Sequence, residues 1–265
     1  MKAVSIIVPV YGDWESLAKN IAALKRCVPA SSSAQVYYVN DCGPEADVLE
    51  ESILRNIGTR KNFHYSRNRQ NLGFVQNCNN AVANIIPKDT DVLLLNSDAI
   101  VTKNFLRRMQ ETLYAESDIA AVCPRSNAAT IFSVPMKPKA GRTYSMRGSY
   151  LKYLTIRHRL PKYYISPIAH GFCMLLRREV IDEYGLFDEI YGKGYGEEND
   201  FCMRVREHGW KCAVANKAYV FHYKARSFSE EKRSKLVEQN EKTLDKRYPE
   251  YRTLVREYVA SINEP

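Results

Sequence analysis

The chain has 265 residues, of which 45% are hydrophobic and 26% are charged, and it carries a formal net charge of +9. This length suits one catalytic domain, and the mixture of apolar and charged residues along the chain excludes a disordered or fibrous protein. The apolar runs are all far shorter than the roughly 18 residues of a membrane-spanning helix, so no such helix is expected.

The start of the chain and its cysteines indicate a compartment. Met1 and Lys2 lead directly into a strand-like run, without the longer apolar core and small-residue cleavage site of a secretion signal. The seven cysteines are odd in number and form no Cys-x-x-Cys pair. We therefore expect a cytoplasmic protein with reduced cysteines and no zinc site, and a peripheral position at the inner face of a membrane is compatible with this.

The excess positive charge belongs to one segment. Residues 119–178 contain 11 Lys and Arg and no Asp or Glu, whereas the rest of the chain has 28 basic and 30 acidic residues. Five tyrosines are interleaved with these cations, namely Tyr144, Tyr150, Tyr153, Tyr163 and Tyr164. Two interpretations stay open: a solvated face, or an acceptor-side surface that stacks on sugars and attracts a lipid pyrophosphate or an anionic membrane.

The first part of the chain alternates strand-like and helix-like patterns, which is typical of a parallel sheet with crossover helices. The expected strands lie at residues 4–10, 35–40, 64–65 and 92–95. The expected helices lie at residues 13–27, 47–57, 74–85 and 103–116. Open sheets of this kind bind ligands at the carboxyl ends of their strands.

The later part is less regular. Residues 126–166 are rich in Pro, Lys, Arg and Tyr, and predict an extended loop region with one helix near Tyr150. Beyond this region we expect strands at 172–176 and 212–222 and helices at 178–184 and 198–208.

The tail from residue 230 has the pattern of a charged helix with one apolar face. The apolar residues recur three and four positions apart, at Leu244, Tyr248, Tyr251, Val255 and Tyr258. Pro249 should divide the tail into two helices. We assign residues 1–226 to a catalytic domain and residues 227–265 to a C-terminal helical extension.

Polar side chains follow the first two predicted strands. The segments are Pro9-Val10-Tyr11-Gly12-Asp13 and Val39-Asn40-Asp41. Their acidic and amide groups are suited to hydrogen-bonding a base and a ribose, with Tyr11 lining the pocket. For Asp13, capping of the next helix explains the residue equally well, and both interpretations stay open.

A carboxylate also follows the buried strand at residues 92–95. There the chain reads Asn96-Ser97-Asp98. A hard divalent ion that bridges two phosphates needs few protein ligands, because the phosphates and waters complete its octahedron. Asp98 fits this role better than capping of the following helix, because the cap position lies nearer Thr102.

A glycine-rich stretch runs into paired carboxylates at a predicted helix start, Gly194-Tyr195-Gly196-Glu197-Glu198-Asn199-Asp200. The helix dipole stabilises acidic residues in a first turn, and this is a purely structural explanation for Glu197, Glu198 and Asp200. Neighbouring helical residues diverge, however, so one carboxylate can face an acceptor while another caps backbone N–H groups or pairs with Arg204. A like-charged neighbour raises the pKa of a carboxylate, which suits it to deprotonate a hydroxyl.

Taken in order, the motifs resemble the large family 2 of inverting glycosyltransferases, which have the GT-A fold. The resemblance runs from about residue 4 to residue 222 and rests on Val-Ser-Ile-Ile-Val-Pro-Val-Tyr, Val-Asn-Asp, Asn71-Leu72-Gly73-Phe74, Leu-Leu-Leu-Asn-Ser-Asp, His170-Gly171-Phe172, Gly185-Leu186-Phe187-Asp188-Glu189 and Glu-Glu-Asn-Asp-Phe-Cys-Met-Arg. It implies an α/β fold with a Rossmann-like, mostly parallel sheet flanked by helices.

The resemblance also implies a set of site residues. Asp98 would end a degenerate Asp-x-Asp motif that holds Mg²⁺ or Mn²⁺, and His222 would reach the metal or the diphosphate, although a structural role for His222 stays open. The base would be Glu198, with Glu197 as the alternative. The donor-binding residues would be Pro9, Tyr11, Asp13, Asp41, Asn71, Gly73, Asn77, Asn96 and Asp98. The acceptor side would contain His170, Gly171 and Asp200.

We therefore predict a metal-dependent inverting glycosyltransferase. It would move a sugar from a UDP, dTDP or GDP donor to a hydroxyl of a saccharide or lipid-linked acceptor, in bacterial surface polysaccharide or glycoconjugate synthesis. A nucleotidyltransferase on a similar fold is one alternative, but the first strand is followed by Tyr11-Gly12-Asp13-Trp14 instead of a glycine-rich, basic loop. A second alternative is a non-catalytic binder of anionic surfaces or nucleic acid that uses residues 119–178. A third is a glycosyltransferase domain that belongs to a larger chain. For the enzyme that we predict, no nucleic-acid partner is expected.

Overall fold

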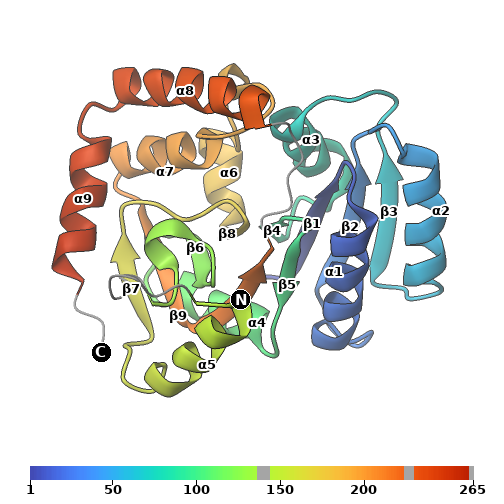
Figure 1. Cartoon of the computed structure of the whole chain (residues 1–265), viewed down its shortest axis with the longest axis horizontal. Coiled ribbons are helices and arrows are strands. Elements are labelled where there is room, and N and C mark those ends of the chain that lie inside the picture. The colour runs from blue at the N-terminus through green and yellow to red at the C-terminus, as the bar shows by residue number, and fades with distance from the viewer. Residues whose placement is uncertain (136–143, 224–229, 263–265) are drawn as a thin grey trace.

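The computed structural model describes residues 1–135, 144–223 and 230–262 (Figure 1). In these residues one sheet of nine strands has the order β3-β2-β1-β4-β8-β6-β9-β5, with β7 paired to β9. The strands are β1 (Val4–Val10), β2 (Gln35–Asn40), β3 (Phe63–Arg67), β4 (Asp91–Leu95), β5 (Ala99–Val101), β6 (Ile119–Arg125), β7 (Tyr163–Ser166), β8 (Cys173–Leu176) and β9 (Lys211–His222).

Helices pack around this central sheet, as Figure 1 shows. They are α1 (Trp14–Cys27), α2 (Ala46–Ile57), α3 (Phe74–Asn80), α4 (Phe105–Leu113), α5 (Met146–Ile156), α6 (Arg178–Tyr184), α7 (Glu197–Glu207), α8 (Glu230–Arg247) and α9 (Tyr251–Ser261). A π-helical turn, η1 (Ala81–Ile85), continues α3, and the short turns η2 (Thr130–Phe132) and η3 (Glu189–Tyr191) lie in loops.

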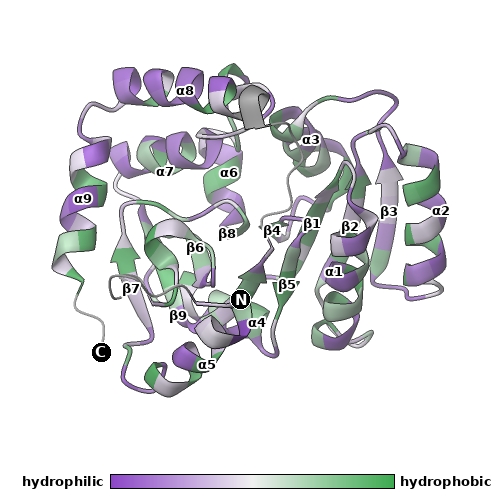
Figure 2. Ribbon diagram, in the orientation of Figure 1, coloured by the Kyte–Doolittle hydropathy of each residue, from purple (hydrophilic) through white to green (hydrophobic). Residues whose placement is uncertain are grey.

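The first half of the sheet forms as the sequence predicts. β1 is parallel to both β2 and β4, and β2 is parallel to β3. β1 and β4 are buried almost throughout because both faces of a parallel sheet are covered, and in Figure 2 much of β1 is coloured as hydrophobic. The carboxyl ends of these strands, where polar residues follow, therefore meet at one edge of the sheet.

The second half of the sheet is mixed. β8 is antiparallel to β4 and β6, and β9 is parallel to β6 but antiparallel to β5 and β7. The parallel arrangement thus holds for β3-β2-β1-β4, while β8, β5 and β7 run against their neighbours. Three strands, β5, β6 and β7, were not predicted. The first is only three residues long, and β7 lies in the segment expected to be loop because its strand conformation depends on pairing with the distant β9.

The C-terminal helices pack against the rest of the domain. Pro249 separates α8 from α9, as predicted. The predicted apolar face is also confirmed: Leu244 and Tyr248 are buried, and Tyr251, Val255 and Tyr258 pack against the main core. The boundary proposed between residues 226 and 227 lies outside the described residues.

All seven cysteines are free thiols, and five of them are buried. Over the described ranges, the structure contains no helix that is both long enough and apolar enough to cross a bilayer.

Candidate active site

The pairing of β5 with β9 places a histidine beside an aspartate. Ala99 pairs with His222 in this antiparallel ladder, and the Tyr223 N–H donates to the Asp98 carbonyl at 3.2 Å. The two side chains consequently meet, with His222 Nε2 3.5 Å from Asp98 Oδ1. Both side chains are about nine-tenths buried, at 11% and 10% exposure.

The orientation of the imidazole follows from its other contacts. Nδ1 lies 3.0 Å from the Ala128 carbonyl oxygen, which can only accept, so Nδ1 carries a proton. In the neutral ring, Nε2 then presents its lone pair to the Asp98 carboxylate. The Phe172 ring stacks on the imidazole at 4.8 Å, and the Asn127 side chain bonds both the N–H and the carbonyl of His222.

This pair fits a divalent cation. A carboxylate oxygen and an imidazole nitrogen face the same point, and the second ring nitrogen is anchored on a carbonyl, as in histidines that bind metals. In the part of the chain that the structure describes, no cluster of three or more His, Cys, Asp or Glu is arranged to hold a metal. Asp98 and His222 would thus leave most coordination positions to phosphate and water, as the sequence analysis expects for Asp98.

The paired glutamates open α7 after a loop with unusual backbone angles. Gly194, Tyr195 and Gly196 all have positive φ, at 116°, 70° and 101°. Burial and the neighbouring Glu198 charge raise the pKa of Glu197 well above its usual value. Burial also raises the pKa of Glu198, against the opposing effect of backbone N–H groups at the helix start.

The two glutamates face different neighbours. A Cβ added at Gly171 would lie 3.4 Å from the Glu198 side chain, and a hydrogen bond from the Gly171 N–H reaches its carboxylate. Glu197 instead approaches Gly194 and lies within electrostatic range of Cys78 on α3. Glu198 is therefore the glutamate directed at the His170–Phe172 turn.

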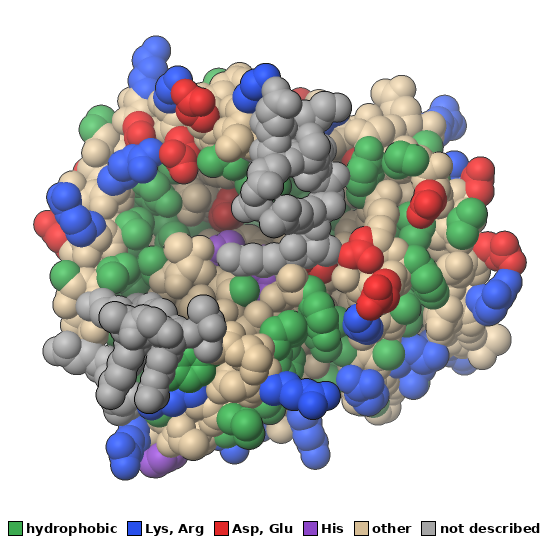
Figure 3. Space-filling model, viewed as in Figure 1, with side chains coloured by type: hydrophobic (Ala, Val, Ile, Leu, Met, Phe, Trp, Pro, Cys, Tyr) green, Lys and Arg blue, Asp and Glu red, His purple; other side chains and the backbone are tan. Residues whose placement is uncertain are grey.

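That turn joins the two parts of the site. Gly171 touches Glu198, while the next residue, Phe172, stacks on His222 and accepts the Asn96 N–H at 2.9 Å. His170 Nε2 lies 3.4 Å from Thr130 Oγ1 on the other flank. In the space-filling view, histidine and acidic side chains gather at the centre of one face, between the two halves of the molecule (Figure 3).

On the predicted donor side, Asp41 organises a loop. Its carboxylate accepts hydrogen bonds of 2.9 Å from the N–H groups of Leu72 and Gly73 and from Asn68 Nδ2. Burial raises the pKa of Asp41, although these donors oppose the effect. The predicted residue Asn71 stays exposed and donates to the Asp41 carbonyl.

Two close approaches at this edge were not predicted. A Cβ at Gly43 would lie 2.0 Å from the Tyr11 carbonyl oxygen, so the two strand ends meet too tightly for a side chain. Gly73 has φ 82°, and a Cβ there would meet Lys193 at 3.3 Å. Lys193 also lies within electrostatic range of Asp41, which places a cation beside the predicted donor residues. The sequence feature that could have indicated Lys193 is its position between Gly192 and Gly194.

Other predicted donor residues have partners inside the protein. Asp13 caps α1, because its Oδ1 accepts from Ser16 N at 3.2 Å. Asn77 is 1% exposed and uses both ends of its amide, accepting from Asn68 Nδ2 and donating to the Val39 carbonyl. Pro9 is half-buried in β1, whereas Tyr11 is 37% exposed at the strand end.

Asp200 does not lie where the sequence analysis placed it. Its side chain is 0% exposed and is bonded by Tyr191 Oη, Arg204 Nε and Arg247 Nη1. A carboxylate without exposed surface and with three protein partners is not available to an acceptor, so we withdraw its assignment to the acceptor side.

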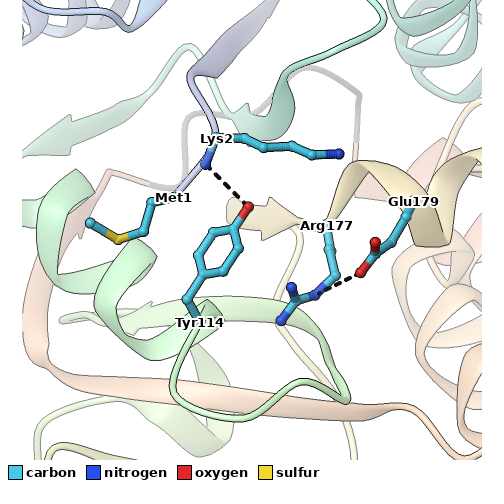
Figure 4. Close-up of a pocket in the computed structure, with 5 residues that line it drawn as sticks. All are labelled: Met1, Lys2, Tyr114, Arg177 and Glu179. Atoms are coloured by element: carbon cyan, nitrogen blue, oxygen red, sulfur yellow. Dashed lines mark hydrogen bonds and ion pairs between the residues drawn. The ribbon is translucent and has the colours of Figure 1, made fainter.

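A separate cavity of about 310 Å³ lies elsewhere and is lined by Met1, Lys2, Tyr114, Arg177 and Glu179 (Figure 4). The Tyr114 hydroxyl accepts from Lys2 N and donates to Asp91 Oδ2. Asp91 begins β4, whereas Asp98 follows its end, so this cavity lies at the opposite end of the strand from the candidate site.

Comparison with known proteins identifies the family. The model of glycosyl transferase family 2 matches residues 5–185. A curated relative, the low-salt glycan biosynthesis hexosyltransferase Agl10 of Haloferax volcanii, is 24% identical over 166 residues, which cover 60% of this chain and 52% of the relative. The chain therefore spans about half the length of that relative.

Similar solved structures include GalNAc-T7 with UDP, GalNAc and Mn²⁺, at a TM-score of 0.64 and 15% identity over 84% of this chain and 44% of that one. The mannosyltransferase PcManGT from Pyrobaculum calidifontis, with GDP-Man and Mn²⁺, has a TM-score of 0.58 and 13% identity, over 99% of this chain and 65% of that one. TarS 1–349 of S. aureus with UDP-GlcNAc has a TM-score of 0.56 and 17% identity, over 86% of this chain and 60% of that one. These likenesses confirm the predicted GT-A fold. Because the family model matches more than half of its residues, the chain belongs to glycosyl transferase family 2.

Proposed function

We propose that this chain transfers a sugar from a nucleoside-diphosphate donor to an acceptor hydroxyl in a single displacement that inverts the anomeric centre. The observation that supports this most is the His170–Phe172 turn, which touches the Asp98 and His222 pair through Phe172 and Glu198 through Gly171. A cation site for the departing diphosphate and a base for the attacking hydroxyl thus adjoin the same three residues.

Asp98 and His222 would hold the divalent ion, which supplies a positive charge that stabilises the departing diphosphate. The Nδ1 contact with Ala128 keeps Nε2 turned toward Asp98. Mg²⁺ is bound through oxygen in proteins, whereas an imidazole nitrogen suits the softer transition ions. We therefore expect Mn²⁺ to support activity better than Mg²⁺.

Glu198 would take the acceptor proton. Its carboxylate lies against Gly171, and its raised pKa makes it a stronger base than an ordinary surface glutamate. Glu197 is directed toward α3 and Gly194, and the Glu198 charge raises its pKa, so Glu197 would keep its proton more readily than Glu198 and would not act on the acceptor.

The nucleoside would lie at the ends of β1 and β2, beside the loop that Asp41 holds, with Lys193 next to the diphosphate. Among the similar structures, GalNAc-T7 contains UDP, TarS contains UDP-GlcNAc and PcManGT contains GDP-Man. These structures support UDP or GDP as the donor nucleotide, and dTDP is proposed from the sequence alone. The curated relative is named for glycan biosynthesis, which supports a saccharide or glycolipid acceptor in surface polysaccharide or glycoconjugate synthesis.

The experiment that tests this function is nucleoside-diphosphate release from a panel of UDP-, dTDP- and GDP-sugars, with Mn²⁺ or Mg²⁺ and a mixture of sugar acceptors. We expect one donor to be turned over and the rate to depend on the metal. If no donor is turned over and no nucleotide binds in a metal-dependent way, the glycosyltransferase proposal fails for this chain.

The basic segment divides into buried and exposed residues. Arg125, Arg177 and Arg178 are buried; the Arg177 guanidinium, for example, donates to the carbonyls of Leu113, Glu116 and Ile119. Lys137, Lys139 and Arg142 lie outside the described residues. On and after α5, Arg147, Arg157, Arg159 and Lys162 are exposed and Lys152 is half-buried, and Leu151 beside them is 62% exposed.

This exposed part is suited to an anionic membrane surface, and Lys and Arg side chains line the corresponding lower edge in Figure 3. Each cation near such a surface contributes about 1 kcal/mol. Replacing Lys152, Arg157 and Arg159 by Gln should therefore weaken binding to phosphatidylserine vesicles by roughly 100-fold. Co-sedimentation with vesicles measures the change.

The control replaces three exposed cations elsewhere by Gln, at Arg26, Lys61 and Lys88. It changes the net charge equally and should lower vesicle binding much less. Equal binding by the wild type and the first triple variant, or equal losses in both triple variants, would exclude a specific membrane contact for this segment.

A further inference from the structure

Helix α8 lies across the loop that leads into the two glutamates. In Figure 1 it forms an outer layer next to α7. Asn240 of α8 is 2% exposed, and its Nδ2 lies 2.8 Å from the Gly194 carbonyl oxygen, 2.9 Å from that of Tyr195 and 3.1 Å from that of Tyr191. Its two amide protons are thus shared among three carbonyl groups of one loop.

A second residue of α8, Arg247, forms ion pairs with residues on both sides of the same loop. Arg247 lies two helical turns beyond Asn240, on the same face. Its Nη1 is 2.8 Å from Asp188 Oδ2, before the loop, and 2.8 Å from Asp200 Oδ1, inside α7. The guanidinium also lies 5.9 Å from the centre of the Tyr191 ring, whose hydroxyl donates to Asp200.

The backbone of the loop takes conformations that residues with side chains rarely adopt. Gly192, Gly194 and Gly196 have positive φ, and Tyr195 adopts a left-handed conformation that side chains rarely favour. Glycine-rich segments of this kind sample many conformations unless other parts of the protein hold them. The loop nevertheless carries Lys193 on one side and leads directly into Glu197 and Glu198 on the other.

We infer that α8 is a positioning element of the active site, in which Asn240 holds the loop at residues 191–196 and so fixes where Glu198 points. This inference rests on the proposed role of Glu198 as base. Neither residue is proposed to contact the reacting groups. Asn240 acts through the loop carbonyls, and Arg247 acts through Asp188 and Asp200. Both residues lie beyond the part of the chain that the family model matches.

Asn240→Asp tests the inference, because it keeps the shape of the side chain but turns a negative oxygen toward carbonyl oxygens. We expect kcat per folded molecule to fall by about 10- to 100-fold, since a small displacement of a catalytic group has an effect of this size. The added charge should also move the acid limb of the pH–rate profile to higher pH. Amide hydrogen exchange in residues 192–198 should accelerate, while exchange in β1 and β4 stays unchanged.

The matched control is Gln239→Glu, which adds the same charge on the adjacent, exposed position of α8 and should leave all of these quantities unchanged. Asn240→Ala serves as a second variant, since it removes the hydrogen bonds without adding charge, and it should accelerate loop exchange and lower kcat in the same direction.

The outcomes separate this inference from the proposed function. If the wild type is active and both Asn240 variants keep the wild-type kcat per folded molecule, or the wild-type loop exchange, α8 has no positioning role. If the variants only lower the folded fraction, with kcat and the pH profile unchanged, the contact is merely structural and the inference is also overturned. A wild type that turns over no donor refutes the glycosyltransferase proposal and the positioning role with it.

Discussion

Glu198→Gln is expected to lower kcat for sugar transfer by about 10²- to 10⁴-fold, the usual contribution of a general base. Glutamine nearly preserves the shape of the side chain that packs against Gly171, but it cannot accept the acceptor proton. The donor KM should change little, because Glu198 is proposed to act on the acceptor hydroxyl and not to bind the donor. Release of nucleoside diphosphate at saturating donor measures the effect.

Glu197→Gln is the matched comparison and should lower kcat much less. If Glu197→Gln were the more damaging change, the roles of the two glutamates would have to be exchanged. If neither variant lost activity, the α7 carboxylates would not supply the base.

The raised pKa of Glu198 gives this prediction a second readout. In the wild type, kcat/KM should fall with acid at a pH above about 4.3, the ordinary glutamate pKa, because the base must be ionised. For a carboxyl whose pKa is raised by folding, the stabilising contribution is complete below the unfolded pKa and is lost as the pH rises through the folded one. Wherever Glu198 is ionised its buried charge thus opposes folding, so at a pH at which the wild type is active Glu198→Gln should melt no lower than wild type. A variant that lost activity by unfolding would contradict this.

Asp98→Asn is the second change with a large expected effect. It removes the carboxylate charge that faces His222 Nε2 and should raise the Mn²⁺ concentration needed for half-maximal activity by at least about 100-fold. Because activity alone would not distinguish lost metal from lost geometry, Mn²⁺ binding in the presence of UDP or GDP should also be followed by electron paramagnetic resonance.

Asp89→Asn provides the control, because Asp89 is an exposed aspartate just before the other end of β4. It removes one negative charge and should leave Mn²⁺ binding as in the wild type. If Asp98→Asn bound Mn²⁺ as tightly as the wild type does, Asp98 would not be a metal ligand.

Strongly periodic segments were predictable from the sequence alone. The buried run of β1 predicted a strand of the sheet, and the tail pattern predicted two helices split at Pro249. The ligand site at the edge where β1, β2 and β4 end stays a prediction. Strands that exist only through distant partners were not predictable: β5 is too short for a pattern, and β7 takes its conformation from β9.

The same limit applies to side-chain roles. The sequence indicated Asp98 and His222 separately, but their contact depends on the ladder between β5 and β9. The sequence assigned Asn77 to donor binding and Asp200 to the acceptor side, because polar residues next to active-site motifs resemble ligand contacts. In the structure both side chains are bonded to other residues of the protein. Asn240 gave no signal, because its partners are backbone carbonyls that any residue could supply.

The central place of β9 has a consequence for how the chain acquires its structure during synthesis. Among the described residues, β5 and β7 have no strand partner other than β9. The four parallel strands at the other side of the sheet are complete once residue 95 has emerged, and domains begin to fold while translation continues. A nascent chain can therefore form these four parallel strands well before His222 joins Asp98, and the ribosome must deliver the chain as far as residue 222 before the two side chains can meet.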